Sequence, residues 1–184
     1  MPMTTDQIAA TFQIRRLNRN EKIDKFNCGD EDLNDFILNE SQLYSQARLA
    51  VSYIIENKHD RHVAGFFSLS NDRVSISDFE SKTEFNRFRK KRFVNEKRIK
   101  SYPAVKIGRL GIDLSVKGQS LGTFILDFIK SYFVMDNKAG CRFITVDAYL
   151  NAIPFYSKNG FLPLSSESDD EHTKLLFFDL EEIE

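Results

Sequence analysis

The sequence predicts an α/β protein in which a mixed β-sheet carries helices on its faces. Strand-like runs fill the first part of the chain, and strand-like and helical segments alternate from residue 104 onward. Apolar residues recur with a period of two in the strand-like runs and with helical spacing in the helical segments. A chain of 184 residues can bury its own core, so we expect one domain over residues 1–184.

The N-terminal elements follow from residue pattern and turn chemistry. Residues 12–17, "FQIRRL", alternate and indicate a first strand. Residues 28–46 open with Gly29 and several acids, which favour a helix N-terminus, and continue with apolar residues at helical spacing. Two β-rich runs, 49–56 and 62–76, flank the turn "NKHDR" and indicate a hairpin.

The C-terminal half alternates more regularly. Gly160 stands where a glycine usually follows a helix C-terminus. The expected elements are a strand at 104–114, a helix at 118–136, a strand at 141–149, a short helix at 151–160 and a last strand at 173–180.

Composition limits the environment of the protein. No run of 18 apolar residues exists, and the N-terminus lacks the basic-then-apolar order of a signal peptide, so we expect a cytoplasmic protein without a membrane span. Cys28 and Cys141 lie far apart and are expected to be reduced thiols. The histidines are dispersed and show no metal-ligand spacing, so we expect no metal.

The segment "RLGIDLSVKGQSLGTFIL", residues 109–126, leads from a strand through a glycine-bearing loop into a helix. A helix start presents unpaired N–H groups and the positive end of a dipole, and glycines allow close approach of a ligand. The N–H groups of residues 118–123, with Lys117, are therefore expected to hold a phosphate or pyrophosphate. Gly108 and Gly111 interrupt the strand, which is typical of a bulge or of close backbone approach.

This segment resembles the acetyl-CoA-binding segment of the GCN5-related N-acetyltransferases, the GNAT family, whose loop reads Q/R-x-x-G-x-G/A. Lys117 stands where Gln or Arg is usual, and Ser120 stands where the central Gly is usual. A serine is compatible with that position if its φ is negative, as it normally is at a helix start. The resemblance implies the GNAT fold, with a mostly antiparallel sheet and splayed central strands, and implies acetyl-CoA as co-substrate.

Further segments extend the resemblance. Residues 147–161, "DAYLNAIPFYSKNGF", resemble the later GNAT segment A-x-x-F-Y-x-x-x-G-F. The N-terminal "FNCGDEDLNDFI" with "VAGFFSLS" is similar to the acetyltransferase toxins of toxin–antitoxin pairs. The likeness covers about residues 12–180 and implies aminoacyl-tRNA as acceptor. It also implies a small antitoxin as partner and allows a homodimer.

The resemblance assigns roles to individual residues. Tyr156 would protonate the leaving thiolate, since a phenol with a pKa near 10 can protonate a thiolate whose conjugate acid has a pKa of about 8.5. The phenylalanine before it is the better candidate for packing. The residues expected to contact acetyl-CoA are Leu110, Gly111, Ile112, Lys117, Gly118, Gln119, Ser120, Leu121, Gly122, Thr123 and Asn151.

A basic segment offers a surface for nucleic acid. Residues 87–100 carry eight basic residues against one acid, in a chain of net charge −1. The segment is either a solvated excursion between strands or a contact for tRNA phosphates. Phe88 and Phe93 are expected to anchor it to the core rather than to stack a base. The expected phosphate ligands are Arg89, Lys90, Lys91, Arg92, Lys97 and Arg98.

Three hypotheses remain open at this stage. The first is acetylation of the α-amine of aminoacyl-tRNA, which needs little base because an α-amine has a pKa of about 7.7–8.0. The second is the same chemistry on a small amine or a protein N-terminus. The third is a non-catalytic binding module on a GNAT scaffold. His59 and His62 are expected to be solvated, and Asp113 and Asp147 to be structural.

Overall fold

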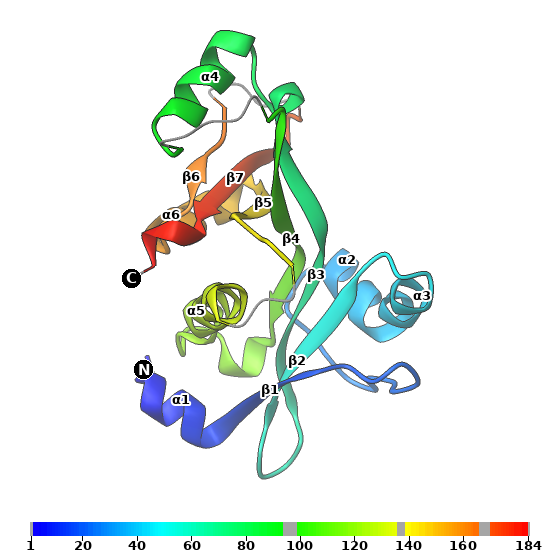
Figure 1. Cartoon of the computed structure of the whole chain (residues 1–184). Helices are drawn as coiled ribbons and strands as arrows, with labels where there is room; N and C mark the ends of the chain where they lie inside the picture. The colour runs from blue at the N-terminus through cyan, green and yellow to red at the C-terminus, as the bar shows by residue number, and fades with distance from the viewer. Residues whose placement is uncertain (1, 94–98, 136–138, 166–169, 184) are drawn as a thin grey trace. The chain divides into compact units, whose positions relative to one another are not determined.

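The computed structural model describes residues 2–93, 99–135, 139–165 and 170–183 (Figure 1). The strands pair in the order β1-β2-β3-β4-β5-β7-β6. The elements are α1 (Thr5–Thr11), β1 (Phe12–Arg16), α2 (Glu31–Asp35), the π-helical η1 (Phe36–Glu40), α3 (Ser41–Gln46), β2 (Val51–Asn57), β3 (Val63–Ser75), η2 (Ile76–Asp78), α4 (Lys82–Lys90), β4 (Ser101–Ile112), η3 (Leu114–Val116), α5 (Leu121–Val134), β5 (Phe143–Tyr149), η4 (Leu150–Ala152), α6 (Ile153–Lys158), β6 (Leu162–Pro163), β7 (Thr173–Asp179) and η5 (Leu180–Glu182).

The mixed, mostly antiparallel sheet predicted from the sequence is confirmed. The pairs β1–β2, β2–β3, β5–β7 and β6–β7 are antiparallel, and β4–β5 is parallel. The β4–β5 pairing covers only Ala104–Lys106 with Phe143–Thr145, although β4 continues to Ile112 and β5 to Tyr149. A parallel ladder that ends while its strands continue agrees with the splayed central strands expected for the fold.

Helix boundaries follow the caps. The helix expected over 28–46 begins at Glu31 because the Asp30 carboxylate accepts the N–H of Leu33 at 3.0 Å. Helix α1 was not predicted, and its capping box joins Thr4 and Gln7. The helix expected over 118–136 begins only at Leu121.

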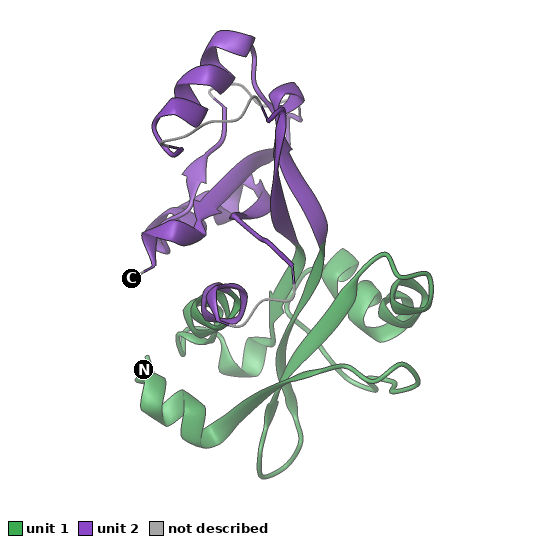
Figure 2. Cartoon of the chain, viewed as in Figure 1, with its two compact units in different colours: residues 1–70, 107–129 green, residues 71–106, 130–184 purple. Residues whose placement is uncertain are grey.

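The chain divides into two compact units, residues 1–70 with 107–129 and residues 71–106 with 130–184 (Figure 2). We call them unit 1 and unit 2. Strands β3 and β4 and helix α5 run through both units. No helix in the described ranges is both long enough and apolar enough to cross a membrane.

In unit 1, two consecutive phenylalanines of β3 show which helices cover which face. Phe66 stacks on Phe36 of η1 at 6.0 Å, whereas Phe67 contacts Phe128 of α5 at 6.1 Å. Successive side chains of a strand point to opposite faces. The segment α2–η1–α3 and helix α5 therefore cover opposite faces of the unit 1 strands (Figure 1).

Unit 2 repeats this arrangement on β7. Phe177 contacts Phe88 of α4 at 5.3 Å, and Phe178 contacts Phe161, which follows α6, at 5.6 Å. Helix α4 therefore packs on the face opposite to Phe161, through a cluster of aromatic residues that includes Phe143.

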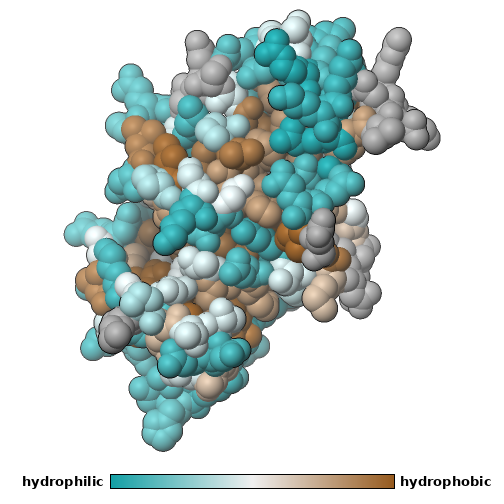
Figure 3. Space-filling model, turned by 90° about the vertical axis from the view of Figure 1, so that its left-hand side faces the viewer, coloured by the Kyte–Doolittle hydropathy of each residue, from teal (hydrophilic) through white to brown (hydrophobic). Residues whose placement is uncertain are grey.

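On the face drawn in Figure 3, hydrophobic side chains lie in small groups among hydrophilic ones.

The buried carboxylate of Asp179 joins two arginines of unit 2. Asp179 is 4% exposed, and its oxygens lie 3.1 Å from Nε of Arg92 and 2.8 Å from Nε of Arg142. Arg142 also pairs with the exposed Glu181. The Arg92 guanidinium lies 4.2 Å from the ring centre of Phe88. This basic residue is therefore held by the core of unit 2.

Replacing Asp179 by alanine should destabilise the protein by about 3–5 kcal/mol, because two guanidinium groups would lose their shared buried partner. Urea unfolding measures the loss. The matched control is Glu181→Ala. Glu181 is 65% exposed and pairs with the same Arg142, so its loss should cost less than about 1 kcal/mol. Equal effects of the two variants would contradict a structural role for the buried carboxylate.

Candidate functional site

The side chain of Asp113 stabilises the start of the loop between β4 and α5. One oxygen of its carboxylate accepts the N–H of Ser115 at 2.9 Å, and the other accepts the N–H of Asn27 at 3.0 Å. Burial alone would raise the pKa of Asp113, but these hydrogen bonds outweigh it and the pKa lies below its usual value. The expectation that Asp113 is structural agrees with this geometry.

Within the loop, the backbone at Gly118 and Ser120 adopts positive φ values of 82° and 67°. The expectation of a negative φ at Ser120 is wrong. The helix starts one residue later, with Phe124 N–H donating to Ser120 O at 3.1 Å, so Ser120 belongs to the turn rather than to the helix. A serine there adopts the left-handed conformation that glycine adopts without steric cost.

The first turn of α5 points its N–H groups out of the helix. Leu121, Gly122 and Thr123 occupy this turn, whose N–H groups have no intrahelical acceptor. Of the donors expected between residues 118 and 123, only the N–H of Gln119 has a backbone partner within the described residues, Val116 O at 3.3 Å. Lys117 is exposed beside them. The loop can therefore offer several donors and one positive charge to an anion.

Strand β4 carries the expected acetyl-arm residues at its C-terminal end. Leu110 and Ile112 are half-buried, and Gly111 is buried. A Cβ on Gly111 would lie 2.8 Å from a ring carbon of Phe66, so residue 111 must be glycine for the strand to pack against this ring. The close approach expected at this glycine is thus made by a side chain of the protein's own core.

Unit 2 carries Tyr156 and Asn151. Tyr156 is 6% exposed, and its ring contacts Phe155 at 5.1 Å and Phe161 at 5.4 Å. The hydroxyl has no hydrogen-bond partner among the described residues, and burial raises the pKa of Tyr156 to about 12. Asn151 is exposed in η4.

Helix α6 holds Tyr156 by its C-terminal geometry. Gly160 has φ of 85°, and its N–H donates to Ser157 O at 3.0 Å while Phe161 N–H donates to Tyr156 O at 3.1 Å. These two bonds form a Schellman motif, as the position of Gly160 predicted.

The basic segment is used in two ways. Lys90 and Lys91 are exposed at the end of α4, whereas Arg92 is paired with Asp179 and Arg89 lies 5.9 Å from the ring centre of Phe85. Lys97 and Arg98 lie outside the described residues. Phe88 is buried, and Phe93 stacks on Tyr102 at 4.3 Å, so both rings anchor the segment as expected.

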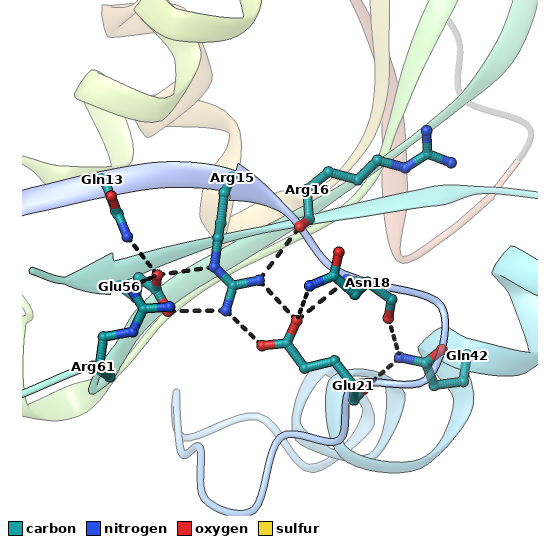
Figure 4. A network of polar contacts seen from close by, with 8 residues as sticks. All are labelled: Gln13, Arg15, Arg16, Asn18, Glu21, Gln42, Glu56 and Arg61. Carbon is teal, nitrogen blue, oxygen red and sulfur yellow. Dashed lines mark hydrogen bonds and ion pairs between the residues drawn. The ribbon is translucent and has the colours of Figure 1, made fainter.

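Sequence reasoning missed a polar network in unit 1 (Figure 4). The Glu56 carboxylate is 2% exposed and lies within 2.9 Å of nitrogen atoms of Arg15 and Arg61, and it accepts Gln13 Nε2 at 2.6 Å. Arg15 also binds Glu21 through both terminal nitrogens. Glu56 lies two residues after the buried Ile54 on β2 and therefore on the same face of the strand, opposite Gln13 of β1. The one sequence signal was an acid at the end of "YIIE".

This network lines a pocket of about 530 Å³. Its wall contains four basic residues and four acidic ones, in addition to His62. Because Glu56 and Glu21 are already paired with arginines, we assign the network to stability. The lining residues are Arg15, Glu21, Lys22, Ile23, Asp24, Lys25, Glu56, Asp60, Arg61, His62 and Val63.

Two histidines and Asp147 were the remaining candidate residues. Nε2 of His62 lies 3.3 Å from Ser115 Oγ, whereas His59 is exposed. Asp147 pairs with Lys106. No group of three or more His, Cys, Asp or Glu side chains able to hold a metal occurs in the described part of the chain.

Stability should fall in acid through Glu56. Hydrogen bonds from Arg15 lower the pKa of Glu56 below the usual 4.5, so its stabilising contribution is complete above that pH and is lost as the pH falls through the lowered value. Glu56→Gln should cost roughly 1.5–3 kcal/mol at pH 7 and flatten the decline below pH 4.5 in urea unfolding. Asp24→Asn, an exposed acid of the same pocket, should leave that slope unchanged; an equal change in both variants would contradict the assignment.

Comparison with known proteins supports the fold. No family model and no curated protein sequence matches the chain. It is similar to a tyrosine-to-phenylalanine variant of KacT, with a TM-score of 0.74 at 23% identity over 94% of this chain and 97% of the other. It is also similar to AtaT complexed with acetyl-methionyl-tRNAfMet, with a TM-score of 0.73 at 25% identity over 94% and 96%.

A third structure holds two ligands. It is a tyrosine-to-phenylalanine variant of the AtaT toxin, bound to the C-terminus of the antitoxin AtaR and to acetyl-CoA. Its TM-score with this chain is 0.69 at 24% identity, over 94% of this chain and 95% of the other. The chain therefore has the GNAT fold, in the form found in the toxin acetyltransferases KacT and AtaT.

Proposed function

We propose that this protein is an acetyl-CoA-dependent N-acetyltransferase of the toxin type, which acetylates the α-amine of aminoacyl-tRNA. The observation that carries the proposal is the open first turn of α5, preceded by two loop residues with positive φ, on a GNAT fold. We further propose that the two units act as one domain, since β3, β4 and α5 run through both. We expect it to work in the cytoplasm, with an antitoxin as partner.

The loop and first turn fit a pyrophosphate. The N–H groups of Leu121, Gly122 and Thr123 and the dipole of α5 favour an anion, and the ammonium of Lys117 adds a charge. The end of β4, Leu110 to Ile112, would supply backbone groups for the acetyl arm, and Asn151 would hydrogen-bond the arm. Acetyl-CoA supplies the thioester carbonyl.

The chemistry is an acyl transfer. The acceptor amine attacks the thioester carbon, a C–N bond forms and the C–S bond breaks. The amine then loses a proton to solvent, the sulfur takes a proton from the Tyr156 hydroxyl, and the phenolate takes a proton back from solvent before the next turnover. Since burial raises the pKa of Tyr156 to about 12, the phenol keeps its proton throughout the physiological pH range. The same shift makes the phenol a weaker acid, so the transfer requires a sulfur whose pKa is raised by burial as well.

The acceptor proposal rests on chemistry and surface charge. The amine of an aminoacyl ester is a weaker base than a lysine side chain, so it needs little help to lose its proton. Lys90 and Lys91 form an exposed basic pair on unit 2. AtaT, which shares the fold, was solved with an acetylated aminoacyl-tRNA.

Acetyl-CoA should raise the melting temperature, because a ligand that binds only the folded state stabilises it. Gly122→Leu should abolish this shift by blocking the first turn of α5. Gly140→Leu is the control, since no atom lies within 4 Å of a Cβ at that position. The absence of a shift at millimolar acetyl-CoA would favour a non-catalytic binding module.

Tyr156→Phe should keep the acetyl-CoA-induced shift and lower kcat by roughly 10²–10⁴, the usual contribution of a general acid. Because the pKa of Tyr156 lies at about 12, the wild-type rate should show no loss of this acid between pH 7 and about 10. Phe155→Leu tests whether any change in this aromatic pair has the same effect. An unchanged rate in Tyr156→Phe would mean that another group protonates the sulfur.

Neutralising Lys90 and Lys91 together should weaken tRNA binding and reduce the slope of log K against log salt by up to about 0.9 for each lost phosphate contact. Arg92 is left intact because it pairs with Asp179. Acetylation of a small test amine should hardly change. Loss of activity toward both acceptors would instead indicate a structural role, and an acceptor range limited to small amines would favour the second hypothesis.

A further inference from the structure

Arg109 lies in β4, next to the segment proposed to hold the acetyl arm, and its guanidinium covers two aromatic rings. The guanidinium carbon lies 4.0 Å from the ring centre of Phe36 and 5.2 Å from that of Tyr44. Its Nε is buried and has no hydrogen-bond partner within the described residues. Arg109 thus lies against two aromatic rings.

Three other half-buried arginines of the described residues pair with carboxylates. Arg15 pairs with Glu21 and Glu56, and Arg92 and Arg142 pair with Asp179. Arg109 forms no ion pair with a carboxylate in the part of the chain that the structure describes. A partly desolvated cation without a counter-ion is unfavourable in the free protein and is compensated when a ligand brings an anion.

The platform under Arg109 is rigid. Phe36 is fully buried and lies edge-on to Tyr44 at 5.3 Å and stacked on Phe66 at 6.0 Å. It opens the π-helical η1, in which Ser41 N–H donates to Phe36 O. Single π-helical turns inside α-helices are frequent at functional sites. In this irregular turn Phe36 packs on Phe66, and Phe66 lies against Gly111 of β4.

Stacking fixes which part of Arg109 remains available. One side of the guanidinium lies against Phe36 and Tyr44 and its Nε is buried, so its terminal NH₂ groups are the part that can bind a ligand. That planar edge matches the oxygens of a phosphate or a carboxylate in a bidentate geometry. Contact with aromatic faces also preorganises the side chain, which lowers the entropy cost of binding.

We propose that Arg109 binds a phosphate group of the acceptor close to its reacting amine. This inference rests on the proposed function, and it identifies a specificity residue on unit 1. In an aminoacyl ester the carboxyl group of the amino acid is esterified, so the anions near the amine are phosphates of the nucleic acid. Arg109 precedes Leu110 directly, so an acceptor held by it would lie near the strand end proposed for the acetyl arm.

The test compares acceptors with and without phosphate. Arg109→Met keeps an unbranched chain over Phe36 but removes the charge, and it should lower kcat/KM for aminoacyl-tRNA by about 10- to 100-fold, as expected for a charge-assisted hydrogen bond. Activity toward alanine methyl ester, which has no anion, should stay within about twofold. Arg109→Lys keeps the charge without the fork and should be intermediate. Arg19→Met, at an exposed arginine of unit 1, controls for a general loss of charge.

Binding provides a second readout. Arg109→Met should reduce the salt slope of tRNA binding by about 0.7–0.9, the value of one phosphate contact. Thermal unfolding checks that each variant is folded, and Arg109→Lys serves if the methionine variant is not. Equal losses toward tRNA and the methyl ester would overturn the proposal in favour of a structural role, and wild-type behaviour with tRNA would overturn it as well.

Two outcomes separate this proposal from the one on which it rests. A loss confined to free alanine, which carries a carboxylate, would make Arg109 a carboxylate-binding residue and contradict the phosphate assignment. If the wild type acetylates no amine, the proposed function fails, and Arg109 is then judged by its salt slope in tRNA binding alone.

Discussion

The contact between Phe66 and Gly111 constrains most of unit 1. The ring can lie against β4 only because residue 111 has no Cβ. Phe66 in turn supports Phe36, and Phe36 supports the guanidinium of Arg109. The glycine expected to accommodate a ligand thus also positions a charged side chain two residues earlier in the strand, on the same face of the sheet.

Buried carboxylates organise the polar groups of each unit separately. Glu56 holds Arg15 and Arg61 in unit 1, and Asp179 holds Arg92 and Arg142 in unit 2. Each carboxylate is almost fully buried and is satisfied by more than one donor, which is the condition under which a buried charge is tolerated. The arginines in these pairs are candidate ligand-binding residues in the sequence, but in the structure they are paired with carboxylates.

The fold and the glycine-bearing loop before α5 could be predicted from the sequence because both depend on local patterns. Strand alternation, helical stripes and the position of Gly160 are read from neighbouring residues, and the structure agrees with them. The ion pair of Arg92 could not be predicted, because its partner Asp179 lies far away in the chain. The basic run that contains Arg92 looks uniformly solvated in the sequence. The buried Glu56 is satisfied by Gln13 and Arg15, which lie far away in the chain, so no local pattern marks it. The left-handed backbone of Ser120 was missed because the start of α5 was expected too early.

Ser120 and Arg109 share a property that the structural pairs lack, because each is locally unfavourable in the free protein. A non-glycine residue in the left-handed region costs roughly 1 kcal/mol, and an arginine with no carboxylate partner among the described residues keeps an uncompensated charge. Natural sequences violate local rules mainly where function requires it. Both violations lie close to the ends of β4 and α5 in unit 1, where the proposed function needs donors for a pyrophosphate and a cation for the acceptor. An incoming anion would satisfy these groups without breaking an ion pair of the described residues, so ligand binding would not have to displace the carboxylates that stabilise each unit.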